Sequence, residues 1–505
     1  MNTIPALVLT DFYKTDHRRQ FPAGTTTVYS NFTPRGSRVP GIEHVVFFGL
    51  QYFVIEYLQR RFHDTFFALP KAQAVGAYRR RLDFSLGAGA VPMDHVEALH
   101  DLGHLPLRIK ALPEGTRVPM QVPTHTIENT DPRFAWLTNF IETMMSAVVW
   151  GPCTSATLAN RYRAVFEEYA ARTGAPREFV RWQGHDFSFR GMHGIEAACT
   201  SGAGHLLSFT GTDTIPAIDF LEQYYGADCE KELIGGSVPA TEHAVMCAGG
   251  KETEIDTYRR LLTEVYPRGI VSVVSDTWDF FAMITRILPQ LKDVILARDG
   301  KLVIRPDSGD PVAILVGDPR APVGSPERKG LIELLWDIFG GSTTPRGHRQ
   351  LDPHIGAIYG DSITLERQHA ILEGLAQKGF ASSNVVLGIG SYTYQYVTRD
   401  TFGFAMKATF CTVAGEDRSI YKQPRTDAKK NSHRGLIAVH RDAHGRLQAR
   451  FPVGRDEERS PANLLQPVFE DGVLLRRQTL AEIRAIVEAE LATDPTARRD
   501  ADAAP

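Results

Sequence analysis

The chain has 505 residues, of which 43% are hydrophobic and 23% are charged, and its formal net charge is -3 at pH 7. This length exceeds that of an average domain, so we expect two or three domains of ordinary globular composition. The small negative charge provides no basic field for nucleic acid or for an anionic membrane, and we predict neither as a partner.

The cysteine pattern and the first residues of the chain bear on the cellular compartment in which the protein works. No two cysteines have CxxC spacing, so we expect free thiols in a reducing environment, not a disulfide framework or a zinc site. The first ten residues lack the basic segment of a signal peptide, and no apolar run approaches the roughly 20 residues that span a bilayer. We predict a cytoplasmic protein.

Residues 1–150 mix short strand-like runs with helices and are predicted to begin a β-rich domain. The apolar segment Trp136–Trp150 is predicted to be a helix, and the pattern changes near residue 155, where a second helix is expected. The expected strands are Val28–Phe32, His44–Gly49, Leu107–Leu112 and Val118–Val122.

From residue 151 to 400, short apolar strands alternate with amphipathic helices, which predicts a parallel sheet covered by helices. Each strand ends in polar or glycine-rich residues, and barrels and open α/β sheets place their active sites at these carboxyl ends. No P-loop or Rossmann fingerprint follows any strand. The expected strands are His205–Phe209, Val271–Val274, Leu302–Ile304, Ile355–Ile358 and Val385–Leu387.

The remaining segments complete the expected domain plan. Residues 313–350 form an insertion rich in Pro, Gly and Arg around one short helix, Leu331–Phe339. Residues 401–492 return to strand-like runs and end in a helix near 478–491, so we assign them to the second part of the β-rich domain. We expect residues 493–505 to be a disordered tail.

The segment Lys301–Asp310 carries the clearest chemistry. Its apolar strand ends in Arg305-Pro306-Asp307-Ser308-Gly309. The planar guanidinium of Arg can bind two phosphate oxygens, Asp suits ribose hydroxyls or a hydrated cation, and Gly lets a ligand approach the backbone. The alternative interpretation is a strand followed by a tight turn with a surface salt bridge.

Two further segments have both a chemical and a structural interpretation. The loop containing Phe187 and Arg190 could stack a planar ring and bind phosphate, or it could be a core aromatic pair beside a solvated arginine. Glu242-His243 follows a turn, and such a histidine could be a base, an acid or a phosphorylated nucleophile, or it could be structural.

Charged residues at several strand ends suit one polyphosphate ligand. If these cationic side chains converge, they would bind the phosphates. The aspartates would then contact the sugar, a hydrated cation and a base. Spacing alone leaves this convergence a hypothesis. The cations are Arg190, Arg305, Arg399, Lys407 and Lys422, and the aspartates are Asp213, Asp276, Asp307 and Asp361.

Ordered motifs over nearly the whole chain resemble the nicotinamide phosphoribosyltransferase family. They include Thr10 to His17, Glu128 to Pro132, His185 to Gly191, Gly211 to Thr214, Ser237 to His243, Val274 to Asp276, Ile304 to Gly309, Gly360-Asp361 and Thr398 to Asp400. The resemblance implies a type II phosphoribosyltransferase: an irregular α/β barrel with a second, β-rich α+β domain built from both chain ends. It also implies a homodimer with shared active sites.

The resemblance assigns roles to individual residues. Nicotinamide would lie between Phe187 and Tyr13 of a second copy, with Asp213 binding its amide; Asp11 belongs to the same motif as Tyr13. Arg190, His243 and Arg305 would bind the phosphate and pyrophosphate, and Asp276 and Asp307 would support the ribose. Arg35, Arg399, Lys407 and Lys422 would come from the second copy, and Gly360, Asp361, Gly390 and Ser391 would line the product phosphate site.

The implied reaction transfers a phosphoribosyl group from 5-phosphoribosyl-1-pyrophosphate to nicotinamide, a step of NAD salvage. Mg²⁺ and cationic side chains would stabilise the leaving pyrophosphate, and ATP would drive the reaction by phosphorylating His243. The direct metal ligands remain unassigned. Where some relatives have three glycines after the last barrel strand, this chain has Gly390-Ser391-Tyr392, which leaves the phosphate contacts there open.

Three alternative functions remain. Another barrel enzyme acting on a phosphosugar is disfavoured because it would not explain Phe187 together with Asp213. A nicotinate phosphoribosyltransferase is disfavoured because the carboxylate of Asp213 would repel a nicotinate anion. A non-catalytic binding or signalling protein on the same scaffold is disfavoured because His243, Arg190, Arg305 and Asp307 are all present.

Overall fold

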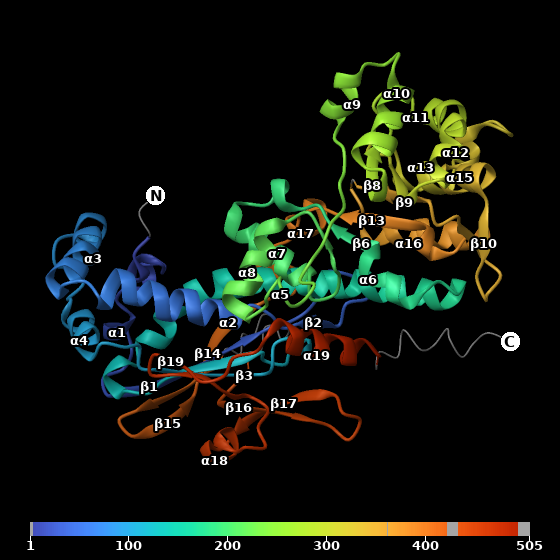
Figure 1. The fold of residues 1–505 in the computed structure, drawn as a ribbon. Coiled ribbons are helices and arrows are strands. Elements are labelled where there is room, and N and C mark those ends of the chain that lie inside the picture. The colour runs from blue at the N-terminus through green and yellow to red at the C-terminus, as the bar shows by residue number, and fades with distance from the viewer. Residues whose placement is uncertain (1–3, 361, 422–432, 493–505) are drawn as a thin grey trace. The chain divides into compact units, whose positions relative to one another are not determined.

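The computed structural model describes residues 4–360, 362–421 and 433–492. The chain divides into two compact units (Figure 1). Unit 1 comprises Met1–Thr157, Phe220–Ala227 and Val397–Val487, and unit 2 comprises Leu158–Asp219, Asp228–Tyr396 and Glu488–Pro505. Among the helices in the described ranges, none has both the length and the apolar character needed to cross a membrane.

Unit 1 is built around an antiparallel sheet that draws strands from both ends of the chain. The strand order is β15-β14-β1-β5-β3-β18-β19, with β5 at the centre between β1 and β3, and with β1 also paired to β14. The sheet strands are β1 (Thr25–Thr33), β3 (Leu107–Ala111), β5 (His125–Asn129), β14 (Ala405–Val413), β15 (Glu416–Ser419), β18 (Gln466–Glu470) and β19 (Val473–Leu474). The predicted β-rich domain from both chain ends is confirmed.

Two small antiparallel pairs and several helices complete unit 1. The pairs are β2 (His44–Val46) with β4 (Arg117–Pro119) and β16 (Leu436–Arg441) with β17 (Leu447–Val453). The helices are α1 (His17–Gln20), α2 (Leu50–Phe53), α3 (Lys71–Leu86), α4 (Asp94–Leu102) and α18 (Arg455–Arg459), with π-helical turns at Val54–Arg61 and His63–Phe67.

Unit 2 is a ring of parallel strands. Its sheet has the order β7-β6-β13-β12-β9-β8. Backbone bridges Gly211↔Gly236 and Ala240↔Ser272 join the segment between β7 and β8 to both of those edge strands, which closes the sheet into an irregular barrel. The strands are β6 (Gly184–Asp186), β7 (Gly211–Thr212), β8 (Arg268–Val274), β9 (Asp299–Arg305), β12 (Ile355–Tyr359) and β13 (Val385–Ile389).

Helices connect the barrel strands, as parallel strands require. They are α6 (Val180–Gln183), α7 (Ile195–His205), α9 (His243–Gly249), α10 (Glu254–Arg260), α11 (Phe280–Ala282), α12 (Lys292–Leu296), α13 (Pro311–Val316), α14 (Pro326–Lys329), α15 (Leu331–Phe339), α16 (Leu365–Gln377) and α17 (Ser391–Tyr394). The predicted insertion contains α14, α15 and the hairpin of β10 (Gly341–Thr343) and β11 (Arg349–Leu351). The predicted α/β barrel is confirmed.

Three helices contain residues of both units. They are α5 (Leu137–Thr173), α8 (Ile215–Tyr225) and α19 (Leu480–Ala492). The predicted separation into two helices near residue 155 is therefore wrong, because α5 continues through Pro152 to Thr173 as one helix. The boundary between the units, at Thr157, lies inside this helix. The predicted tail, residues 493–505, lies outside the described residues.

The predicted strand at His205–Phe209 is also wrong. His205 ends α7, the amide of Leu206 still donates to the carbonyl of Gly202, and the strand is Gly211–Thr212. Leu206 and Phe209 are fully buried, so a short apolar run was present, but such a run does not distinguish a strand from a helix end.

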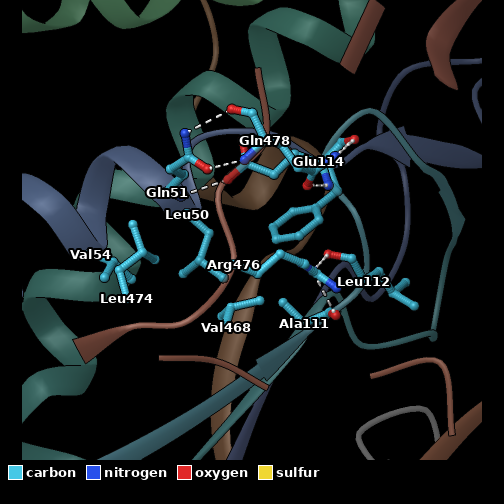
Figure 2. A pocket seen from close by; sticks show the side chains of 11 residues that line it. Leu50, Gln51, Val54, Ala111, Leu112, Glu114, Val468, Leu474, Arg476 and Gln478 are labelled. Atoms are coloured by element: carbon cyan, nitrogen blue, oxygen red, sulfur yellow. Dashed lines mark hydrogen bonds between the residues drawn. The ribbon is translucent and has the colours of Figure 1, made fainter. Parts of the chain in front are cut away.

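A buried carboxylate fixes the two chain ends together inside unit 1 (Figure 2). Glu114 accepts hydrogen bonds from the amides of Gly49 (2.9 Å) and Gln51 (2.6 Å) and from the hydroxyl of Tyr225 (2.9 Å). Burial raises the pKa of Glu114, and these donors act in the opposite direction. Gln478 accepts a bond from the Glu114 amide (2.7 Å) and donates its own amide to the Gln51 side chain (2.7 Å).

The neighbouring residues close this contact without leaving space for a ligand. Arg476 donates to the carbonyls of Ala111 (3.2 Å) and Leu112 (3.1 Å). The cavity between these segments has a volume of about 20 Å³. This is room for a single water molecule, so the cluster serves to stabilise the fold.

We expect Gln478→Ala to lower the free energy of unfolding by about 1–3 kcal/mol, because it leaves the Glu114 amide without its partner. Urea unfolding followed by circular dichroism measures the change. Gln448→Ala is the control, since Gln448 is exposed on β17 and its loss should change stability by less than about 0.5 kcal/mol. Equal effects of the two variants would contradict this account.

Candidate active site

The carboxyl ends of the barrel strands bring together most of the residues predicted from unit 2. Parallel strands present these ends at one edge, and the loops that follow them meet there. The last residue of β9 is Arg305, and the residues directly after the other strands include Phe187 (β6), Asp213 (β7), Asp276 (β8), Gly360 (β12), and Gly390 and Ser391 (β13).

Asp213 is held by two hydrogen-bond donors. His185 Nε2 lies 2.8 Å from Asp213 Oδ1, and the Ser237 hydroxyl donates to the same oxygen at 2.6 Å. Burial acts to raise the pKa of Asp213, but these two hydrogen bonds and the positive charge of Arg305 outweigh it, and the pKa lies below the ordinary value of 3.8. Asp213 is therefore a carboxylate at neutral pH, with its side chain about half exposed.

Phe187 lies against two glycines at the same edge. Its amide donates to the carbonyl of Ile389 (3.1 Å), which ties the loop after β6 to β13. A Cβ on Gly388 would come within 2.9 Å of Phe187 Cε2 and 2.8 Å of the Gly360 Cα, so larger residues would displace the ring. The half-buried phenyl group is a flat apolar surface suited to stacking against a planar ligand.

His243 faces two carboxylates. It begins α9, its Nδ1 lies 3.1 Å from the Thr277 hydroxyl, and its Nε2 lies 3.8 Å from Asp276 Oδ1 and 3.9 Å from Asp307 Oδ2. The imidazole is 47% exposed, so a ligand can reach it. Asp276 Oδ2 accepts bonds from the Asp307 amide (2.9 Å) and the Ser308 hydroxyl (2.6 Å), which fixes the acidic pair.

These carboxylates fit a magnesium ion that arrives with a phosphate ligand. Within the described ranges, no group of three or more His, Cys, Asp and Glu side chains is arranged to hold a metal by itself. Asp276 Oδ1 is buried without a hydrogen-bond partner, and Asp307 is exposed beside it. Mg²⁺ commonly binds through one or two carboxylates, water and substrate phosphates, so this donor set suits it.

Arg305 and Arg190 supply positive charge at the same edge. Arg305 donates one nitrogen to the carbonyl of Thr241, while its buried Nε has no hydrogen-bond partner. Arg190 is exposed on the 3-10 turn Phe189–Gly191. Both guanidinium groups keep donors that can bind phosphate oxygens.

Ser391 packs directly against Gly191. A Cβ at Gly191 would overlap the Ser391 side chain, whereas nothing lies within 4 Å of the Cβ position of Gly390. The hydroxyl of Ser391 thus lies next to the turn that carries Arg190, while Gly390 remains open to a ligand.

The other predicted residues lie in unit 1 or outside the described ranges. Asp11 accepts a bond from the Thr143 hydroxyl (2.6 Å), Tyr13 is exposed against His17, and Lys407 is exposed on β14. Arg35 donates to the Gly403 carbonyl (2.9 Å), close in sequence to Arg399, which is paired with Asp400 at 3.5 Å. Asp361 and Lys422 fall outside the described residues.

Sequence reasoning gave no role to the residues that hold the predicted ones in place. These are His185 and Ser237 for Asp213, Thr277 for His243, and Ser308 for Asp276. Each lies within two residues of a predicted site residue or in the same quoted motif, so position in the motif was the available signal.

Comparison with family models identifies the chain. Residues 182–472 match the nicotinate phosphoribosyltransferase (NAPRTase) family, and residues 5–64 match the N-terminal domain of nicotinamide phosphoribosyltransferase. The chain belongs to the nicotinate phosphoribosyltransferase family. The first match spans every strand end of the barrel of this phosphoribosyltransferase, and the second includes Asp11, Tyr13 and Arg35.

Similar proteins agree with this assignment. A nicotinamide phosphoribosyltransferase from Acinetobacter baylyi is 53% identical over 488 residues, covering 94% of this chain and 95% of that protein. One from Xanthomonas campestris is 34% identical over 497 residues, covering 96% and 98%. The predicted family is confirmed.

Solved structures show the same fold at low sequence identity. Nicotinate-nucleotide pyrophosphorylase from Pyrococcus furiosus has a TM-score of 0.59 and 16% identity, with 97% of this chain and 98% of that chain covered. Human nicotinic acid phosphoribosyltransferase has a TM-score of 0.56 and 17% identity, with 97% and 95% covered.

A buried histidine supports the strand that carries Asp213. His205 Nε2 donates to the carbonyl of Gly211 (3.0 Å), because a carbonyl only accepts, and Nδ1 then accepts from the Tyr394 hydroxyl (2.7 Å). This is the arrangement of the neutral imidazole, whereas a protonated ring would donate from both nitrogens. Burial lowers the pKa of His205 from 6.5 to about 4, against the opposing charge of Asp186.

We expect His205 to make the phosphoribosyltransferase less stable in acid. The unfolded chain binds a proton near pH 6.5 and the folded chain near pH 4, so its contribution is complete above pH 6.5 and is lost as the pH falls toward 4. Urea unfolding between pH 6.5 and 4.5 should show a slope about 1.4 kcal/mol per pH unit shallower in His205→Gln than in the wild type. The control Gln448→Ala, which removes no titratable group, should keep the wild-type slope, and parallel slopes for His205→Gln and the wild type would refute the assignment.

Proposed function

We propose that this chain is a nicotinamide phosphoribosyltransferase that makes nicotinamide mononucleotide and pyrophosphate from nicotinamide and 5-phosphoribosyl-1-pyrophosphate, in NAD salvage. The observation that carries the proposal is the ionised carboxylate of Asp213 at the barrel edge that also presents Phe187. A carboxylate accepts a hydrogen bond from a carboxamide NH₂ but repels the carboxylate of nicotinate. Both curated relatives named above are nicotinamide phosphoribosyltransferases.

The chain's own residues would bind and orient the reactants. Phe187 would stack on the pyridine ring, and Arg190 and Arg305 would bind the phosphate and pyrophosphate. The ring nitrogen of nicotinamide forms a bond to C1 of the ribose while the bond from C1 to the pyrophosphate oxygen breaks, and the electron pair leaves with pyrophosphate. The nitrogen already has a lone pair, so the step needs no protein base.

The acidic pair would support the ribose and the cation. Asp276 and Asp307 are the residues that would hold Mg²⁺ together with the pyrophosphate oxygens. Magnesium, when bound, neutralises charge that develops on the leaving group. The hydroxyl of Ser308 and the amide of Asp307 keep Asp276 oriented for this role.

ATP coupling through His243 is part of the proposal. The exposed imidazole would attack the γ-phosphorus of ATP, forming a nitrogen–phosphorus bond and releasing ADP. Its Nε2 faces Asp276 and Asp307, the same carboxylates that suit magnesium. The support is this accessibility and the resemblance of Ser237 to His243 to the family motif.

The deciding assay offers nicotinamide or nicotinate with 5-phosphoribosyl-1-pyrophosphate and Mg²⁺, with and without ATP. We expect nicotinamide to be preferred in kcat/KM by about a hundredfold or more, because like charges in contact cost several kcal/mol. ATP should increase product and yield ADP, and His243→Ala should lose both effects while His354→Ala keeps them.

Each alternative gives a different result in this assay. Product from nicotinate alone would assign the chain to the nicotinate-specific enzymes. Absence of product from either base would favour a binding protein on the same scaffold. Unchanged ADP formation in His243→Ala would exclude this histidine as the phosphorylated residue.

We also propose that the enzyme is a homodimer in which Tyr13, Arg35, Arg399, Lys407 and Lys422 of one copy serve the site of the other. The support is the family resemblance and the position of Tyr13, Arg35, Arg399 and Lys407 in unit 1, whereas Asp213 and Arg305 lie in unit 2. A closed two-fold dimer would then contain two shared sites.

Mixed dimers test the shared site directly. Arg305→Ala and Arg399→Ala should each be inactive. In the co-expressed mixture about half of the dimers are mixed and each has one intact site of two, so about a quarter of wild-type activity should return; mixed dimers purified through two affinity tags should have about half. The control pair, Arg305→Ala with Asp307→Ala, should restore none. No recovery in the first pair would show that each copy completes its own site.

A further inference from the structure

We propose that His185 is the positioning residue that sets base specificity, because it holds both the amide acceptor Asp213 and the stacking ring Phe187 in place. This inference rests on the proposed function and concerns how the same site distinguishes a carboxamide from a carboxylate. His185 lies in β6, buried, between these two residues in space.

The hydrogen bonds to Asp213 are asymmetric. Because an ionised carboxylate only accepts, His185 Nε2 carries the proton in its 2.8 Å bond to Oδ1, and the Ser237 hydroxyl donates to that same oxygen. Within the described ranges, Oδ2 of Asp213 accepts no hydrogen bond. One oxygen is therefore saturated by the protein, and the other is kept for the ligand.

This asymmetry fixes the direction of the free oxygen. A carboxylate held by two donors on one oxygen cannot turn about its terminal bond without breaking both, so Oδ2 keeps a single orientation. A carboxamide NH₂ can donate to that oxygen, and a ligand carboxylate would meet it as a second negative charge. Loss of the donors would let the carboxylate rotate and would weaken both effects.

The second contact of His185 is with the stacking surface. The imidazole and Phe187 rings are 4.6 Å apart with an interplanar angle of 44°. On its other side, the imidazole packs closely on the next strand, since a Cβ at Gly211 would lie 2.7 Å from His185 Nδ1. Because Gly211 has no side chain, the imidazole of His185 can pack in this place. Its fixed position in turn fixes Phe187 and Asp213, which it contacts.

A role in proton transfer does not account for this arrangement. The nitrogen of nicotinamide attacks without losing a proton, so no base is needed, and His185 directs its proton to Asp213. If His185 were purely structural, its loss would lower the activity with all substrates alike. A positioning role predicts that the two bases respond differently while 5-phosphoribosyl-1-pyrophosphate does not.

Two substitutions separate the hydrogen bond from the ring. His185→Phe keeps an aromatic ring and removes the donor, and the ratio of kcat/KM for nicotinamide to that for nicotinate should fall about tenfold to a hundredfold. His185→Gln keeps a donor, and the ratio should stay within about threefold of the wild type. In both variants the KM for 5-phosphoribosyl-1-pyrophosphate should change less than about twofold, as expected when its contacts are intact.

The controls cover histidine loss and misfolding. His354→Phe is matched, because His354 also bonds an aspartate (Asp352, 2.7 Å) but lies before β12, at the opposite end of the strands. It should leave the ratio unchanged. Ser237→Ala removes the other donor from an exposed side chain, and the ratio should fall severalfold even if His185→Phe does not fold.

The outcomes separate the inference from the proposed function. If the wild type makes no product from nicotinamide, both the function and this inference are overturned. If the wild type prefers nicotinamide and a folded His185→Phe keeps the wild-type ratio, the inference alone is overturned. An unchanged ratio in Ser237→Ala has the same consequence when His185→Phe cannot be isolated.

Discussion

The parallel closure of the barrel is the constraint on which the rest of unit 2 depends. Because β6, β7, β8, β9, β12 and β13 run in the same direction, all their carboxyl ends meet at one edge. The bridges of the segment 236–240 to β7 and β8 bring Ser237 next to Asp213 and lead the chain to His243. Residues more than 100 positions apart in sequence thereby form one site at the strand ends and on the loops that follow them.

Close packing at that edge depends on the absence of side chains at a few positions. Phe187 can lie where it does because Gly388 has no Cβ, and His185 because Gly211 has none. Bulky residues there would force the aromatic ring outward, since a close-packed interior transmits displacements of this size. The glycines after and within the strands are therefore part of the recognition surface, although they make no polar contact with a ligand.

Much of this could be predicted from the sequence, and the reasons for the exceptions are physical. The strands Arg268–Val274 and Ile355–Tyr359 and the helix Leu331–Phe339 follow their apolar patterns, so the strand ends before Asp276 and Gly360 were recognisable. The run His205–Phe209 was misassigned because helix ends and strands share short buried apolar runs. His185 and Ser237 gained their roles only from three-dimensional contacts with Asp213, which is 28 and 24 residues away in sequence, and spacing does not reveal such contacts.

The site must attract a polyanion while keeping three carboxylates, and its hydrogen bonds explain how both are possible. Asp213 is satisfied on one oxygen by His185 and Ser237, and Asp276 on one oxygen by Ser308 and the Asp307 amide. Each donor spreads the negative charge and leaves one defined oxygen, which under the proposed function would accept from an amide in the first case and bind a cation in the second. Arg305 supplies positive charge that attracts a polyanion, and the same charge also lowers the pKa of Asp213. Removing one aspartate would therefore change the affinity of the site for phosphate, in addition to removing the contact that this aspartate makes with the ligand.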